Sequence, residues 1–343
     1  MKQINWGIIG LGSIASQFAK GFKYVDNAKL LAIASKTTSK LKKFQEDFNI
    51  SNSYSFDNYE SLIENDEIDI VYIAVPNSLH HEWIVKCLKN GKKVLVEKPA
   101  TINSLEIEDI KNNYINNETF FNEAFMYLYH PQTKKILELI KSGEIGKLIS
   151  METAFGHNIL TKKNFLGFKK KKKINPDNRI HNKKLGGGVI LDLGCYPVSF
   201  SMLIASLVSK INYDKVKIIN KKKEVGSTGV DVDANMEIVF ENNFKSKIAS
   251  SFTQNLGNET KIFGSNGEII IKDTWMAQDS KIIVKKLDRK DLVINIQSNQ
   301  NIYSYEIKAL SQHILDKKMN IDFPGLTIED TISNMKILDR WRS

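Results

Sequence analysis

The sequence predicts an α/β protein in two parts: an N-terminal doubly wound parallel sheet, and a C-terminal α+β domain with a mostly antiparallel sheet. The length of 343 residues corresponds to about two domains. Short apolar runs alternate with helical patterns through the first third, whereas from about residue 147 strands follow one another through short connections. A hydrophobic content of 42% excludes a mainly disordered chain. We therefore expect domains over residues 1–122 and 123–343.

In the first domain, apolar runs mark the strands and apolar residues at helical spacing mark the helices between them. Ile14, Phe18 and Phe22, for example, lie on one face of a helix. The predicted strands are residues 5–9, 29–34, 54–56, 69–75, 93–97 and 119–121. The predicted helices are residues 13–24, 41–48, 79–89 and 105–115. This alternation is typical of a parallel sheet.

The second domain is expected to combine its antiparallel sheet with helices on either side in sequence. Alternating patterns predict strands at residues 235–240 and 245–252, and the sequence GSNG at 264–267 predicts a hairpin turn. Helices are predicted at residues 130–142 and 188–208. Two more are expected near the C-terminus, the last with Thr327 as its N-cap.

Charge and cysteine content exclude several classes of function. The 49 lysines and arginines exceed the 39 acidic residues by 10, and one loop-like run over residues 162–184 carries most of the excess. A nucleic-acid-binding protein would spread basic residues over a face and interleave aromatic side chains for stacking. We therefore expect no nucleic-acid partner; the run is either a solvated loop or attracts a phosphorylated ligand. Cys87 and Cys195 are expected to be buried free thiols. His80 and His81 lack companions for a metal site, so no metal is expected.

We also expect a cytoplasmic protein with no membrane partner. The sequence shows no run of about eighteen continuous apolar residues, which a membrane-spanning helix would need. Residues 1–6 lead directly into the first predicted strand and do not resemble a secretory signal.

A glycine-rich turn, GLGSIA at residues 10–15, follows the first predicted strand and opens a helix. Gly10 allows the tight turn, Gly12 lets the backbone approach a pyrophosphate, and Ser13 and Ile14 begin the helix whose N–H groups face the anion. The end of the second strand reads Ser35–Lys36–Thr37, where an NAD site would carry an acid. These three residues suit a 2′-phosphate, so NADP is expected over NAD. The alternative is that Lys36 is a solvent-facing loop residue.

Two further segments carry candidate catalytic chemistry. Lys98, between Glu97 and Pro99, lies at the carboxyl end of a predicted parallel strand, where ligands bind in doubly wound sheets. In the segment GGGVILDLGCYP, Asp192 and Tyr196 are four residues apart and share one face of a helix. Because a proline ring clashes with the carbonyl four residues before it, Pro197 predicts a bend beside Tyr196.

In combination, these motifs resemble the Gfo/Idh/MocA oxidoreductase family over nearly the whole chain. The resemblance rests on the glycine-rich turn, AVPNSLH at residues 74–80, EKP at 97–99, EAFM at 123–126 followed by YHP at 129–131, and GG at 187–188 leading to Asp192 and Tyr196. Many members have histidine at the position of Tyr196. With tyrosine there, the chain resembles the branch that holds dimeric dihydrodiol dehydrogenase, NADP-dependent xylose dehydrogenase and glucose–fructose oxidoreductase. The chain departs from that branch at Tyr127–Leu128, which leaves the substrate open.

The resemblance implies a Rossmann dinucleotide-binding domain, an open-faced antiparallel sheet that pairs subunits into a homodimer or larger oligomer, and hydride transfer between nicotinamide and a hydroxyl or carbonyl carbon of a sugar, polyol or cyclic diol. Tyr196 would transfer the proton, Lys98 would stabilise the charge on oxygen, and Asp192 would orient a hydroxyl. Further cofactor contacts are expected at Pro76, Asn77, His80, Glu97 and Lys98, and substrate contacts at Arg179 and Tyr127. The alternatives are an enzyme acting on a phosphorylated or nucleotide-linked sugar and a non-catalytic NADP-binding regulator.

Overall fold

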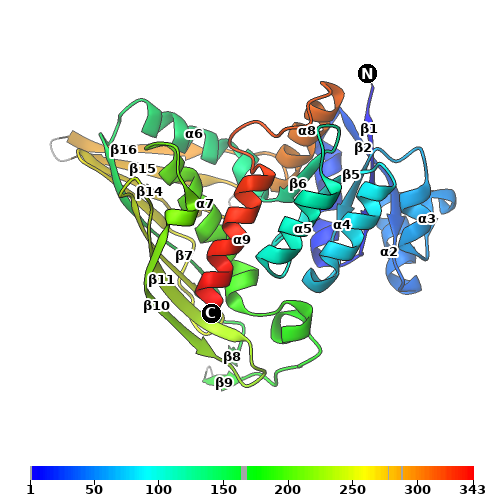
Figure 1. The fold of residues 1–343 in the computed structure, drawn as a ribbon, viewed down its shortest axis with the longest axis horizontal. Coiled ribbons are helices and arrows are strands. Elements are labelled where there is room, and N and C mark those ends of the chain that lie inside the picture. The colour runs from blue at the N-terminus through cyan, green and yellow to red at the C-terminus, as the bar shows by residue number, and fades with distance from the viewer. Residues whose placement is uncertain (1, 164–167, 277, 287–288) are drawn as a thin grey trace. The chain divides into compact units, whose positions relative to one another are not determined.

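The computed structural model describes residues 2–163, 168–276, 278–286 and 289–343 (Figure 1). The chain folds into two compact units. Unit 1 comprises Met1–His130 and Ser298–Ile332, and unit 2 comprises Pro131–Gln297 and Ser333–Ser343. The chain thus leaves unit 1, builds most of unit 2, and returns to unit 1 for residues 298–332. The predicted assignment of dinucleotide binding to residues 1–122 and of substrate binding to 123–343 stays a prediction.

Unit 1 contains a six-stranded parallel sheet in the order β3-β2-β1-β4-β5-β6. The order reverses between β1 and β4, and such a switch point in a parallel sheet is where ligands bind. The strands are β1 (Ile4–Ile9), β2 (Ala28–Ala34), β3 (Ser55–Phe56), β4 (Ile70–Ile73), β5 (Lys93–Glu97) and β6 (Phe121–Ala124). Nearly all their apolar side chains are buried, as expected of a sheet covered on both faces.

The helices of unit 1 largely follow the prediction. They are α1 (Ser13–Ala19), α2 (Thr38–Phe48), α3 (Tyr59–Glu64), α4 (His80–Lys89), α5 (Ser104–Tyr114) and α8 (Ile302–Leu315). Helix α3 was not predicted. Helix α8 joins unit 1 because Trp6 of β1 donates a hydrogen bond from Nε1 to Ser311 Oγ at 3.0 Å, and Asn27 Nδ2 donates to the Lys308 carbonyl at 3.1 Å. Figure 1 shows α8 beside β1 and β2.

Unit 2 is built on an eight-stranded sheet in the order β10-β11-β12-β7-β13-β14-β15-β16. Strands β12 and β7 pair in parallel and the other neighbours pair antiparallel, so the predicted mostly antiparallel sheet is confirmed. The strands are β7 (Leu148–Gly156), β10 (Lys217–Val225), β11 (Asp231–Val239), β12 (Lys245–Ser251), β13 (Thr260–Gly264), β14 (Gly267–Ile271), β15 (Ser280–Lys286) and β16 (Arg289–Ile296).

The two edge strands of this sheet are exposed along most of their length. Strand β10 presents Lys217 and Lys222 to solvent, and β16 presents Arg289 and Lys290. Two inner strands instead alternate: β11 and β12 bury every second side chain, including Met236. The sheet therefore has one covered face, and both of its edge strands carry exposed positive side chains.

A helical segment inside unit 2 changes its hydrogen-bonding pattern just before Tyr196 and Pro197, where a bend was predicted. The segment begins as a π-helix over Ile190–Gly194 and continues as α7 (Cys195–Ser206). Wider π-helical bonding occurs here because the Pro197 ring would meet the Leu193 carbonyl in a regular α-helix. Two further helices are α6 (Pro131–Lys141) and the C-terminal α9 (Ile328–Arg342). The predicted N-cap Thr327 directly precedes α9, and its Oγ1 accepts from Asp330 N at 3.2 Å.

The residues from Lys183 to Ser206 form a helical run that is long and apolar enough to cross a membrane by length and composition. Within that run, 89% of the most apolar stretch is buried inside the protein. A core helix passes the same test, and Phe200 and Ile204 are fully buried against their neighbours. We therefore interpret this run as a core helix.

The lysine-rich run over residues 162–184 was predicted as a loop, and the structure describes it in part. Residues 164–167 lie outside the described residues. On either side, β8 (Thr161–Lys163) and β9 (Lys169–Lys171) pair as an antiparallel hairpin. Short 3-10 turns then lead to Gly186. Both cysteines are buried free thiols, as predicted.

Candidate active site

The turn after β1 has the geometry that dinucleotide binding requires. Gly10 has a φ of +86°, and a Cβ added there would lie 2.6 Å from the Ala74 carbonyl oxygen, so a side chain does not fit. Gly12, the N-cap of α1, differs: no described heavy atom lies within 4 Å of an added Cβ. The backbone is therefore open at the helix start, where Ser13 and Ile14 begin α1 and N–H groups can face a phosphate. These residues fit a bound pyrophosphate.

The end of β2 presents the residues predicted to bind a 2′-phosphate. Ser35 is buried, and its Oγ accepts a hydrogen bond from Thr37 N at 3.1 Å, which shapes the turn. Lys36 and Thr37 are exposed. An ammonium and a hydroxyl at this strand end fit an anionic group, although the contact itself stays a prediction.

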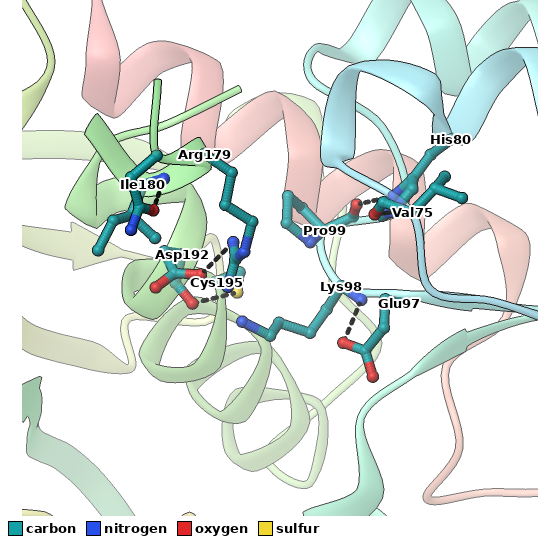
Figure 2. A network of polar contacts seen from close by, with 10 residues as sticks. Val75, His80, Glu97, Lys98, Pro99, Arg179, Ile180, Asp192 and Cys195 are labelled. Carbon is teal, nitrogen blue, oxygen red and sulfur yellow. Dashed lines mark hydrogen bonds and ion pairs between the residues drawn. The ribbon is translucent and has the colours of Figure 1, made fainter. Parts of the chain in front are cut away.

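His80 joins two strand ends of unit 1 (Figure 2). Its Nδ1 lies 2.9 Å from the Pro99 carbonyl and its Nε2 lies 2.9 Å from the Val75 carbonyl. Carbonyl oxygens only accept, so the ring nitrogen that carries the proton donates to the carbonyl it faces. The ring is fully buried. The structure thus gives His80 a bridging position, and its direct contact with a cofactor stays a prediction.

The short turn before His80 carries the two other residues predicted to contact the cofactor on this segment. Pro76 is the N-cap of the 3-10 turn Asn77–Leu79, with extended backbone angles. The Pro76 carbonyl accepts from Leu79 N at 2.8 Å. Asn77 is 4% exposed, and the contacts of Pro76 and Asn77 with a cofactor stay predictions.

Lys98 extends from the carboxyl end of β5, next to a buried carboxyl group. Glu97 Oε2 accepts from the Lys98 backbone N at 3.2 Å (Figure 2), and Glu97 Oε1 accepts from the Tyr72 hydroxyl. Glu97 is 8% exposed, whereas Lys98 is half-buried. The Glu97 contacts fix the backbone from which the Lys98 side chain extends; a contact between Glu97 and the cofactor stays a prediction.

A second buried carboxyl group, that of Glu123, binds the backbone two residues after Lys98. Glu123 on β6 accepts from Ala100 N at 2.9 Å through Oε1. Burial raises the pKa of Glu123 to about 7, while the Ala100 N–H and the charge of Lys98 oppose the rise. The sequence motif EAFM contains Glu123, but the motif alone did not assign it this contact.

We predict that Glu123 makes the stability of unit 1 depend on pH. Its folded pKa lies above the ordinary value of 4.5, so the folded state holds the proton more tightly. The contribution of protonated Glu123 to the free energy of unfolding is therefore complete below pH 4.5 and is lost as the pH rises toward 7. Between about pH 5 and about pH 8, the wild type should lose roughly 3 kcal/mol of unfolding free energy relative to Glu123→Gln. Urea unfolding at both pH values measures this difference.

The exposed Glu118 offers a matched control for this experiment. Glu118→Gln removes the same carboxyl group from the surface and should follow the wild type at both pH values. Equal pH dependence in wild type and Glu123→Gln would show that Glu123 ionises in its ordinary range.

In unit 2, the structure brings together two of the predicted site residues. Arg179 Nη1 and Asp192 Oδ1 form an ion pair at 3.0 Å, and Cys195 Sγ lies 3.9 Å from the Asp192 carbonyl (Figure 2). The Asp192 side chain is 14% exposed and that of Arg179 is 49% exposed. The arginine thus reaches the acid from a loop, and both groups keep some access to solvent.

Tyr196 lies in an aromatic environment that the sequence did not indicate. Its ring meets Phe155 edge-on at 5.2 Å between centroids and meets Trp275 at 5.8 Å in a tilted arrangement. Trp275 is itself fixed by donation from Nε1 to the Ala154 carbonyl at 3.0 Å. Tyr196 is 5% exposed, so packing against these aromatic rings sets the position of its own ring.

Asp231 of β11 anchors the helical segment that carries Asp192 and Tyr196. Its Oδ1 accepts from Ile190 N at 2.7 Å, at the start of the π-helix. Gly188 has a φ of +118°, and a Cβ added there would lie 2.7 Å from the Asp231 carboxylate. Burial raises the pKa of Asp231, while the Ile190 N–H opposes the rise. The sequence reasoning missed this residue, because an acid in an alternating strand carries no motif.

Tyr127 lies in the 3-10 turn Met126–Tyr129 of unit 1. Its ring is buried and meets Phe125 edge-on at 5.9 Å between centroids. Its predicted substrate contact stays a prediction. Within the described part of the chain, no three His, Cys, Asp or Glu side chains gather as metal ligands do.

Comparison with protein families gives two matches that follow the two sheets. Residues 4–121 match the model described as an oxidoreductase family with an NAD-binding Rossmann fold. Residues 133–270 match the model described as the GFO/IDH/MocA C-terminal domain. Together the two matches cover most of the chain.

Named relatives and solved structures match over nearly the full length. A trans-1,2-dihydrobenzene-1,2-diol dehydrogenase from Xenopus tropicalis is 26% identical over 97% of this chain and 96% of its own. A dTDP-3,4-didehydro-2,6-dideoxy-alpha-D-glucose 3-reductase from Saccharopolyspora spinosa is 25% identical over 85% of this chain and 81% of its own. A 3-ketoreductase from Actinomadura kijaniata, solved with NADP and TDP-benzene, has a TM-score of 0.81 at 22% identity, covering 98% of this chain and 96% of its own. At that identity, the structural likeness shows the fold.

Proposed function

Because the chain belongs to the Gfo/Idh/MocA family of oxidoreductases, we propose that it is an NADP-dependent enzyme acting on a hydroxyl or carbonyl carbon of a sugar, polyol or cyclic diol. The observation that carries this proposal is the pairing of two strand ends in unit 1. The open Gly12 turn lies at the end of β1, and the Ser35–Lys36–Thr37 segment lies at the end of the neighbouring β2. Dinucleotides bind across this part of a doubly wound sheet.

Preference for NADP is proposed from the chemistry at the end of β2. An NAD site would carry an acid there to accept from the ribose 2′-hydroxyl, and a carboxylate would repel a 2′-phosphate. Lys36 instead offers a cation and Thr37 an exposed hydroxyl. The Actinomadura relative was solved with NADP. NAD remains the alternative cofactor.

The proposed roles of the side chains follow from their chemistry. When bound, NADP supplies the hydride donor or acceptor. Tyr196 is the group that gives or takes the hydroxyl proton, because its ring is fixed between Phe155 and Trp275. Lys98 stabilises negative charge on the reacting oxygen. Asp192 accepts a hydrogen bond from a substrate hydroxyl and so orients it.

Arg179 supports the choice of a polyhydroxylated substrate. Its guanidinium forms an ion pair with the Asp192 carboxylate, and both side chains keep some exposure, so the pair offers donors and acceptors that suit hydroxyl groups of the substrate. A sugar or diol presents adjacent hydroxyls that such a pair can bind at both ends. The Xenopus relative bears the name of a diol dehydrogenase, which supports the same substrate class.

A second candidate function is action on a phosphorylated or nucleotide-linked sugar. The exposed lysines around the β8–β9 hairpin favour it, because they create a positive potential that attracts phosphate; they are Lys170, Lys172, Lys173, Lys183 and Lys184. The Saccharopolyspora relative is named as a reductase of a dTDP-linked sugar. We further propose that the enzyme works in the cytoplasm as a homo-oligomer formed through the unit 2 sheet.

The experiment that tests the function is nicotinamide absorbance with purified protein. We would assay a panel of aldoses, cyclic diols, keto-sugars and their phosphorylated or nucleotide-linked forms, each with NADP and NAD. Turnover of a free sugar or diol that prefers NADP supports the first proposal. Turnover restricted to the phosphate-bearing forms supports the second, and cofactor binding without any turnover would contradict both.

A further inference from the structure

The Lys36 ammonium lies over aromatic rings. Its Nζ is 5.5 Å from the centroid of the Tyr59 ring and 6.0 Å from that of Trp83. The two rings meet edge-on at 4.8 Å between centroids. Trp83 is 2% exposed and Tyr59 is half-buried, so the pair forms a fixed wall built from α3 and α4. Lysines on a surface usually lack such a support, and this one follows directly after β2.

An aromatic face can hold a cation without cancelling its charge. The attraction comes from the ring quadrupole, which carries no net charge, so the ammonium keeps its full field toward a second partner. A carboxylate in the same place would hold Lys36 as well but would neutralise it. A lysine that must bind a phosphate is therefore better positioned by rings than by an acid.

A carboxylate does lie close to Lys36, and another lysine engages it. Glu60 follows Tyr59 in sequence and forms an ion pair with Lys86 Nζ at 2.8 Å. Lys86 also pairs with Glu82 at 2.8 Å and lies 4.0 Å from the Trp83 centroid. The hydrogen bond from Lys86 is the main cause that lowers the pKa of Glu60, and the charge of Lys36 adds a smaller contribution. Glu60 thus feels both lysines but is hydrogen-bonded to Lys86.

We propose that Tyr59, Trp83 and the Lys86–Glu60 ion pair are positioning residues that determine cofactor specificity. The rings hold the Lys36 ammonium at the end of β2, and Lys86 keeps the Glu60 carboxylate away from it. Lys36 therefore presents an uncompensated positive charge to a 2′-phosphate. This inference rests on the proposed NADP preference and adds the groups that produce it.

Direct binding of NADPH and NADH to the purified protein, followed by nicotinamide fluorescence, tests the inference without a substrate. Tyr59→Leu removes the ring face at a half-buried position and should weaken NADPH binding by about two- to five-fold. NADH binding should not change, because NADH has no 2′-phosphate. The conservative Tyr59→Phe keeps the ring and should keep the discrimination between the two cofactors.

The Lys86–Glu60 ion pair is tested by breaking it and then removing the carboxylate that this frees. Lys86→Gln frees Glu60 to pair with Lys36 and should weaken NADPH binding by about two- to five-fold, again without effect on NADH. Adding Glu60→Gln removes the competing carboxylate and should restore NADPH affinity. Lys36→Gln removes the cation itself, so the loss of NADPH affinity in that variant is the upper limit for the other variants. Circular dichroism of each variant confirms that it is folded.

Three outcomes would overturn the inference. Equal weakening of NADPH and NADH by Tyr59→Leu would mean that the ring stacks on the adenine or supports the fold. Unchanged NADPH affinity in Tyr59→Leu and Lys86→Gln, with a clear loss in Lys36→Gln, would leave the role of Lys36 intact and remove its positioning residues. No loss in Lys36→Gln would remove both this inference and the proposed contact of Lys36 with the 2′-phosphate.

Discussion

Replacement of Tyr196 by phenylalanine should lower kcat by about 10²- to 10⁴-fold, the usual contribution of a positioned acid or base. The substitution removes one hydroxyl group and leaves the ring packed against Phe155 and Trp275. Cofactor affinity and thermal stability should therefore stay close to wild type. Steady-state kinetics with the best substrate of the panel, combined with NADPH titration, measures both effects.

Tyr24→Phe is the matched control, since Tyr24 is 42% exposed and lies in unit 1. It makes the same chemical change and should leave kcat unaltered. Wild-type turnover in Tyr196→Phe would assign the proton transfer to another group, for which Asp192 is the next candidate.

Replacement of Lys98 by methionine should lower kcat by about 10²- to 10³-fold, because a charge that stabilises the developing oxyanion is lost. The backbone around it should persist, since Glu97 binds the Lys98 N–H and Glu123 binds the Ala100 N–H. We expect KM to change much less than kcat. Kinetics at several pH values, with circular dichroism as the check on folding, measures the loss.

Lys93→Met provides the matched control at the opposite end of the same strand, β5. It should retain wild-type kcat. The double variant Lys98→Met/Tyr196→Phe adds a further test. If the two groups act on one reaction, the combined loss should be smaller than the product of the single losses. Fully multiplicative losses would contradict their joint action.

Much of unit 1 could be predicted from the sequence because its strands are buried on both faces and read as apolar runs. β5 was predicted with its observed ends, Lys93–Glu97. The last strand was placed too early: β6 covers Phe121–Ala124, whereas residues 119–121 were expected. The polar Asn122 and Glu123 interrupt the apolar pattern, although both side chains are buried. Helix α3 was missed because six residues are too few to show a helical period.

Unit 2 was harder to predict, for two physical reasons. Its edge strands β10 and β16 are exposed on most positions, so they lack the alternation by which strands are recognised. The parallel pairing of β12 with β7 joins segments far apart in the chain, and no local pattern encodes it. Pro197 predicted an irregular helix beside Tyr196, and the structure has a π-helix directly before α7, because a proline acts on the residues just before it.

The candidate site likewise combines residues that local motifs reveal with residues that only tertiary packing brings to them. Gly10, Gly12, Lys36, Lys98 and Tyr196 lie in motifs that local sequence reveals. The groups that support them lie elsewhere in the chain: Tyr59 and Trp83 beside Lys36, Phe155 and Trp275 beside Tyr196, and Asp231 below the π-helix. Such partners are set by tertiary packing, and one sequence does not show which distant residues will meet.

The charged edges of the unit 2 sheet bear on how copies of this protein meet in solution. A strand edge with free backbone N–H and C=O groups is a template for aggregation, and lysine on the edge is a common protection against it. Here Lys217 and Lys222 on β10 and Arg289 and Lys290 on β16 give both edges positive side chains. Two copies approaching edge to edge would repel each other, so continuous sheets and fibrils built through these edges are disfavoured.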